Sequence, residues 1–188
     1  MARAHTYEPE TPMTRDEFLV WAEQQPSGRF ERIDGIVVAM APERASHNRC
    51  KRAACDALRR ALSKAALDSC EVFADGMTVR VDDSDFEPDA QMRYGPQLPG
   101  DSTQVSDPLV LIEVLSPDSE TRDRATKLRA YFRLPSVQHY LIVWPDEQRI
   151  VRHSRMPNGD VATQIFVSGE IRLDPPGIAM TVEEFYAD

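Results

Sequence analysis

The chain has 188 residues and a formal net charge of −9, with 41% hydrophobic and 28% charged residues. These values are ordinary for a globular protein and exclude collagen-like, intrinsically disordered and disulfide-rich chains. The acidic balance disfavours binding to nucleic acid or an anionic membrane over the whole surface, although a local basic surface remains compatible with it. The sequence has no apolar run of membrane-spanning length and no apolar signal-peptide core, so we expect a cytoplasmic protein without a membrane partner.

The predicted elements alternate between helices and strands. Residues 1–12 are polar, contain two prolines and are expected to form a flexible tail, and residues 13–188 are expected to form one domain. In chain order we expect a helix at 14–25, a hairpin at 29–40, a helix at 46–67, strands at 70–74, 77–81, 88–92 and 109–114, a helix at 121–134, a strand at 138–144, a hairpin at 149–167 and a short helix at 181–186. This order predicts an α/β (α+β) fold in which helices flank a mixed β-sheet.

The predicted helix at 46–67 concentrates positive charge, with six basic residues against one acidic residue. A basic helical face can follow a phosphate backbone, and it can equally be an ordinary solvated surface. Most of the basic residues lie on the face opposite the apolar side of the helix. His47 and Lys51 instead project from the N-terminal end of the apolar side. The candidates for nucleic-acid contact are therefore Arg49, Arg52, Arg59, Arg60 and Lys64.

Glu113 interrupts the most apolar strand of the chain, at 109–114. A carboxylate buried there without a partner would cost several kcal/mol, about 2–7 for a neutral polar group and more for a charge. The partner could be a functional cation. It could also be an arginine or backbone amides that satisfy a glutamate at the edge of the sheet.

Lys127 lies one turn before Tyr131 and one turn after Asp123 in the predicted helix at 121–134. One interpretation is a surface ion pair between Asp123 and Lys127, four residues apart. The other interpretation is that Lys127 and Tyr131 share an inward face and point to the end of the strand that carries Glu113.

The order of four segments along the chain resembles that of the putative restriction endonuclease family, a branch of the PD-(D/E)XK nuclease superfamily. The resemblance spans about residues 14–186, and its motifs are each short but are specific in their order. The segments are Phe30-Glu31-Arg32-Ile33-Asp34-Gly35, Ala45-Ser46-His47, Pro88-Asp89, and Glu113-Val114-Leu115-Ser116-Pro117 leading to Lys127 and Tyr131.

The resemblance implies a restriction-endonuclease-like fold and hydrolysis of phosphodiester bonds in nucleic acid, with DNA as the expected substrate. Asp89 and Glu113 would be both catalytic residues and ligands of Mg²⁺ or Mn²⁺, with the Val114 carbonyl as a third ligand. The superfamily pattern places a lysine two residues after the acidic residue, where this chain has Leu115. The resemblance assigns that catalytic role to Lys127 instead.

Three further residues are candidates for the same site. Glu31 is either an additional acidic ligand or a surface glutamate on a strand. His47 is either a site residue near a helix N-terminus or a packed histidine. Tyr131 is a candidate because it shares a helical face with Lys127.

Two other functions remain open. The absence of a lysine at position 115 is compatible with an inactive nuclease fold that binds nucleic acid or a protein. The acidic loop at 82–107 would suit a hydrolase of small phosphate esters, because it would repel a long polyanion. A homodimer is expected only by analogy.

Overall fold

The computed structural model describes residues 11–40, 42–115 and 121–187, and for residues 121–123 only the backbone. The chain divides into two compact units, Met1–Pro42 with Arg80–Phe86, and Glu43–Val79 with Glu87–Asp188. The predicted tail at 1–12 falls largely outside the described residues, and the single domain over 13–188 stays a prediction.

The first unit is built on a four-stranded sheet in the order β2-β1-β5-β4. Its elements are α1 (Arg15–Glu23), β1 (Phe30–Ile33), β2 (Ile36–Ala39), β4 (Val79–Val81) and β5 (Ser84–Phe86). Thr14 caps α1 in a capping box with Glu17, and β1 pairs antiparallel with β2 in the hairpin predicted at 29–40. Arg32 is fully buried and binds Asp85 at 2.8 Å.

The second unit contains a six-stranded mixed sheet in the order β10-β9-β8-β7-β6-β3 and a separate pair, β11-β12. Strands β7 and β8 are parallel and α3 connects them, whereas the other pairs of this sheet are antiparallel. The elements are α2 (Ala45–Lys64), β3 (Cys70–Ala74), β6 (Ala90–Tyr94), β7 (Pro108–Val114), α3 (Thr121–Tyr131), β8 (His139–Trp144), β9 (Arg149–Arg155), β10 (Val161–Phe166), β11 (Glu170–Leu173), β12 (Ile178–Thr181) and the 3₁₀ helix η1 (Val182–Phe185). The α+β fold with a mixed sheet is confirmed.

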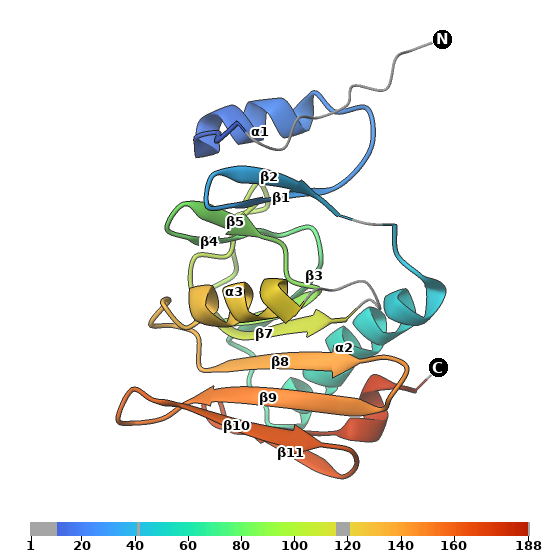
Figure 1. Ribbon diagram of the computed structural model, residues 1–188. Helices are drawn as coiled ribbons and strands as arrows, with labels where there is room; N and C mark the ends of the chain where they lie inside the picture. The colour runs from blue at the N-terminus through green and yellow to red at the C-terminus, as the bar shows by residue number, and fades with distance from the viewer. Residues whose placement is uncertain (1–10, 41, 116–120, 188) are drawn as a thin grey trace. The chain divides into compact units, whose positions relative to one another are not determined.

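Helices α2 and α3 cover opposite faces of this sheet (Figure 1). Ala54 and Leu58 of α2 lie in one core cluster with Ile112 of β7. On the other face, the rings of Tyr131 and Tyr140 are in edge contact, with centroids 5.1 Å apart. Strand β7 is therefore covered on both faces, which explains its almost continuous run of apolar residues.

Several sequence predictions were wrong in detail. The helix predicted at 46–67 begins at Ala45, and Arg44 occupies the N-cap position without a side-chain hydrogen bond. Strand β6 begins at Ala90, two residues later than expected, so Asp89 precedes the strand. Strands β5, β11 and β12 were not predicted. Within the described residues, no helix has the length and hydropathy that crossing a membrane requires.

Candidate active site

Asp89 is held at the end of strand β7. Ala90 pairs with Ile112 of β7, which places Asp89 beside the last residues of that strand. Asp89 Oδ2 accepts a hydrogen bond from the backbone N–H of Val114 at 2.7 Å. His47 of α2 reaches the same residue, with Nε2 2.6 Å from the Val114 carbonyl oxygen and 3.7 Å from Asp89 Oδ2. The backbone of Val114 is therefore the point at which Asp89 and His47 meet.

Lys51 lies one turn after His47 and contacts three carboxylates. Its Nζ is 2.5 Å from Glu43 Oε1, 2.6 Å from Asp75 Oδ2 and 3.0 Å from Asp89 Oδ1. The lysine is 4% exposed. We call the connected group the α2 cluster, and its members are Glu43, His47, Lys51, Asp75 and Asp89.

The α2 cluster has more negative than positive charge. Burial would lower the pKa of Lys51, but the charge of Asp89 and hydrogen bonds to Asp75 and Glu43 raise it above its ordinary value, so the ammonium stays charged. Burial raises the pKa of Glu43, and Lys51 more than reverses this, so the pKa is lowered. Among the described contacts, one ammonium thus faces three carboxylates.

A second group, which we call the α3 cluster, comprises Glu113, Lys127 and Tyr131. Lys127 Nζ lies 3.2 Å from Glu113 Oε1 and 3.3 Å from Oε2, and the Tyr131 hydroxyl donates to Oε1 at 2.7 Å. All three residues are buried. Lys127 thus points inward together with Tyr131, whereas the side chain of Asp123, its partner in the surface interpretation, lies outside the described residues. Among the described contacts of this cluster, one ammonium faces one carboxylate.

The two clusters meet at the carboxyl end of β7 from opposite faces of the sheet. Glu113 faces α3, and the next residue, Val114, packs in the core beneath α2 and gives its amide to Asp89. The structure therefore brings Asp89 and Glu113 to the same strand end. Within the described part of the chain, the group of potential metal ligands with atoms within 4.8 Å of one another comprises Glu43, His47 and Asp89, and Glu113 is outside it.

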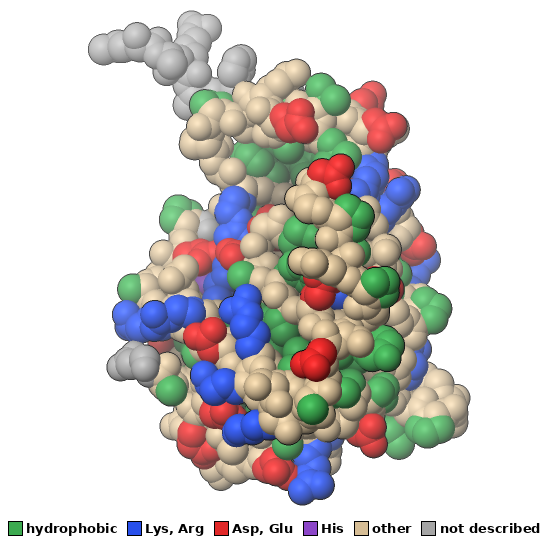
Figure 2. Space-filling view, turned by 180° about the vertical axis from the view of Figure 1, so that it is seen from behind, with side chains coloured by type: hydrophobic (Ala, Val, Ile, Leu, Met, Phe, Trp, Pro, Cys, Tyr) green, Lys and Arg blue, Asp and Glu red, His purple; other side chains and the backbone are tan. Residues whose placement is uncertain are grey.

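The remaining candidates are distributed differently. Glu31 lies on β1 in the first unit, and its role stays a prediction. The five basic candidates of α2 are exposed, and Figure 2 shows basic side chains interspersed with acidic ones on the face seen from behind. Arg59 contacts Asp56 at 3.5 Å, and Arg60 contacts Glu184 at 3.2 Å. The nucleic-acid role of this surface also stays a prediction.

Sequence reasoning missed Lys51, Glu43 and Asp75 as members of the candidate site. A signal for Lys51 was present, because a lysine on the apolar side of an amphipathic helix needs a buried partner. Its partners could not be identified, because Glu43 precedes the helix and Asp75 lies in the turn after β3.

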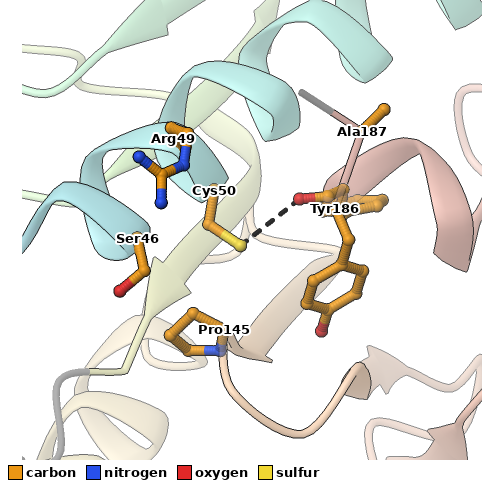
Figure 3. A pocket seen from close by; sticks show the side chains of 7 residues that line it. Ser46, Arg49, Cys50, Pro145, Tyr186 and Ala187 are labelled. Carbon is orange, nitrogen blue, oxygen red and sulfur yellow. Dashed lines mark hydrogen bonds between the residues drawn. The ribbon is translucent and has the colours of Figure 1, made fainter.

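A pocket lies on another side of α2 (Figure 3). It is lined by Ser46, Arg49, Cys50, Pro145, Phe185, Tyr186 and Ala187. The Cys50 thiol donates to the Phe185 carbonyl at 3.3 Å, and burial raises the pKa of Cys50 to about 11, so the thiol stays protonated at neutral pH. The pocket contains no member of either cluster.

The fold is a mixed sheet flanked by helices, with acidic residues at the end of a central strand. The family described as "Putative restriction endonuclease" (Uma2) matches residues 15–183, and the chain belongs to this family. The chain is 24% identical over 181 residues to the uncharacterized protein slr1290 of Synechocystis sp. (strain ATCC 27184 / PCC 6803 / Kazusa), a match that covers 93% of this chain and 91% of that protein. The crystal structure of a putative nuclease belonging to DUF820 from Anabaena variabilis ATCC 29413 has the same fold, with a TM-score of 0.73, 16% identity and coverage of 93% of this chain and 98% of that one.

Proposed function

We propose that this protein is an endonuclease that hydrolyses phosphodiester bonds of nucleic acid, with DNA as substrate and Mg²⁺ or Mn²⁺ as cofactor. The observation that supports this most directly is the approach of Asp89 and Glu113 to the same end of β7, with Lys127 bound to Glu113. Membership of the family supports the same class of activity.

The residues present suit a divalent cation. Asp89, Glu113 and the Val114 carbonyl offer the hard oxygen donors that Mg²⁺ prefers, and the excess negative charge of the α2 cluster favours a cation nearby. When bound, such an ion would lower the pKa of a water molecule and polarise the phosphate. Asp89 is fixed for this role by the Val114 amide.

The chain's own cations would act on the substrate. Lys127 is held by Glu113, and Tyr131 fixes the carboxylate from the same helical face. An ammonium in this position would stabilise the charge that develops on the phosphate. The exposed basic residues of α2 would contact the phosphate backbone, which makes binding weak and strongly dependent on salt.

The test is cleavage of supercoiled DNA, single-stranded DNA and RNA at low salt with Mg²⁺ or Mn²⁺. We expect Asp89→Ala and Glu113→Gln to reduce cleavage by at least about a hundredfold, because each removes a group that acts on the transition state. The exposed Asp101→Asn serves as the matched control and should cleave like the wild type. Circular dichroism checks that the variants fold.

Absence of cleavage on every substrate with either ion would contradict the proposal. Leu115, in the place of the superfamily lysine, favours a second function, binding of nucleic acid without catalysis. Retained binding to DNA without cleavage would support that function. Hydrolysis of p-nitrophenyl phosphate alone would instead indicate a small phosphate ester as substrate.

A further inference from the structure

His47 has one ring nitrogen with a partner and one without. Its Nε2 lies 2.6 Å from the Val114 carbonyl oxygen, and a carbonyl only accepts hydrogen bonds, so Nε2 carries the hydrogen. Its Nδ1 is buried and has no hydrogen-bond partner among the described residues. In the neutral ring, a lone pair on Nδ1 therefore points into the protein.

This arrangement differs from that of His139, another buried histidine. His139 Nε2 donates to the Pro175 carbonyl at 2.9 Å, and its Nδ1 is 2.9 Å from the Ser154 hydroxyl, so both nitrogens are satisfied. At His47, Nδ1 instead faces the Glu43 carboxylate, with 3.8 Å between Nδ1 and Oε2. Glu43 Oε2 also accepts a hydrogen bond from Asn48 Nδ2 at 3.4 Å, and a cation between this oxygen and the Nδ1 lone pair would be bound by both groups.

We propose that Glu43, His47 and Asp89 bind one divalent transition-metal ion, of the class of Mn²⁺, Co²⁺ or Zn²⁺. One ligand atom of each residue lies within 4.8 Å of the others. Ligand atoms about 2.1 Å from a shared ion are roughly 3–4.2 Å apart, so small side-chain shifts complete the site. A ligand histidine commonly donates its other ring N–H to a backbone carbonyl, as His47 does to Val114.

Lys51 limits this site to one ion. Glu43 and Asp89 each give one oxygen to the Lys51 ammonium, Oε1 and Oδ1, and turn the other toward His47. Glu43 Oε2 faces Nδ1, whereas Asp89 Oδ2 lies 3.7 Å from Nε2, so in the proposed site the Asp89 carboxylate would shift toward Nδ1 and each carboxylate would bridge the ammonium and the metal. The remaining exposure of the Glu43 and His47 side chains, 24% and 12%, gives an ion access from solvent.

The site deepens the proposed function, since Asp89 belongs to both, but it is tested by binding alone. The full chain, freed of metal with a chelator, is titrated with Co²⁺ and followed by visible absorption, and with Mg²⁺ by calorimetry. We expect one Co²⁺ per chain and at least about tenfold weaker Co²⁺ binding in His47→Ala. Mg²⁺ affinity should change less than about threefold, because Mg²⁺ prefers oxygen ligands.

His153→Ala is the matched control, since it removes an imidazole that the structure bonds to Thr163 and should leave Co²⁺ binding unchanged. Absence of Co²⁺ binding in the wild type, or equal Co²⁺ affinity in His47→Ala, would overturn the inference. Cleavage is scored separately. His47-dependent Co²⁺ binding without cleavage would refute only the nuclease proposal, and Mg²⁺-dependent cleavage without Co²⁺ binding would refute only this site.

Discussion

The α2 cluster and the α3 cluster are both buried at the end of β7 and both contain a lysine, yet their charges are balanced differently. In the α3 cluster, Lys127 and the Tyr131 hydroxyl satisfy the single carboxylate of Glu113. In the α2 cluster, Lys51 faces three carboxylates, and a neighbouring histidine nitrogen has no hydrogen-bond partner.

This difference in charge suggests that the α3 cluster orients its own side chains and that the α2 cluster attracts a cation. In a buried pair of one ammonium and one carboxylate the two charges compensate each other, and the geometry of the pair fixes the side chains that take part. An unbalanced group keeps its excess charge only if a further cation is available or if water reaches it. The α3 cluster is therefore suited to holding an ammonium in place, and the α2 cluster is suited to taking up a metal.

The largest expected effect is on stability when each lysine is removed. Lys51→Met leaves three carboxylates without their ammonium, and we expect a loss of about 3–5 kcal/mol in the free energy of unfolding. Lys127→Met should cost less, about 1–3 kcal/mol, because Tyr131 still donates to Glu113. Urea unfolding in the presence of a chelator measures both.

Addition of a divalent ion sharpens this contrast. It should restore more of the stability of Lys51→Met than of Lys127→Met, because the ion replaces the ammonium among three carboxylates in the first variant and beside one carboxylate in the second. Lys64→Met, at an exposed position of α2, is the control and should change stability by less than about 0.5 kcal/mol. Equal losses in the two buried variants would refute the contrast between the clusters.

The pH dependence of stability is the next largest expected effect. It sets the pH range in which the stabilities of the two lysine variants can be compared. Burial lowers the pKa of His139 to about 4, and Arg152 adds to the shift while the Pro175 carbonyl opposes it. The unfolded histidine has a pKa of about 6.5, so between these values the unfolded state binds more protons than the folded state. Stability from this group is complete above pH 6.5 and falls by about 3 kcal/mol as the pH drops to about 4.

Unfolding in urea from pH 8 to pH 4, which spans the interval between the unfolded and folded pKa values of His139, measures this loss. His139→Gln should remove most of the slope, leaving a smaller contribution from His153, whose pKa burial also lowers. Glu43 contributes in a lower range, since its pKa is reduced and its stabilisation is lost only as the pH falls below the ordinary value of 4.5. If the free energy of unfolding of His139→Gln fell with decreasing pH as steeply as that of the wild type, His139 would not be the source of the acid sensitivity, and the two clusters would be its source instead.

The sequence predicts those parts of the fold that depend on local pattern. The capping box of Thr14 and the apolar run of β7 are local signals, and both elements form where expected. Strands β5 and β11 have only three and four residues, too few for a periodic pattern to be recognised. Strand β5 pairs with the distant β1, whereas β11 pairs with β12, the next strand along the chain.

The candidate site likewise has one part that local spacing predicts and one part that only tertiary packing brings together. The spacing of Lys127 and Tyr131 places both on one helical face, and the structure brings that face onto Glu113. The three carboxylates around Lys51 come from separate segments, and their approach depends on the packing of α2 against the sheet. Residues that meet only through tertiary packing leave no spacing in the sequence from which their contact could be inferred.

The smallest expected effect on stability concerns Arg52, the immediate neighbour of Lys51 on α2. Arg52 is exposed where Lys51 is buried, and among the described residues it has no ion-pair partner. Arg52→Ala should change the free energy of unfolding by less than about 0.5 kcal/mol. If the basic face of α2 contacts phosphates, the same substitution weakens binding to duplex DNA of any sequence and lowers the dependence of log affinity on log salt by about one.

Fluorescence anisotropy with a labelled duplex, from about 50 to 200 mM salt, measures that dependence. Arg172→Ala is the control, because Arg172 is also exposed but lies on β11, where it contacts Glu170. Equal salt dependence in the wild type and Arg52→Ala, with a change in Arg172→Ala, would place the nucleic-acid surface away from α2. The charge that α2 exposes to solvent would then serve solubility, and only its buried side, with His47 and Lys51, would belong to the site.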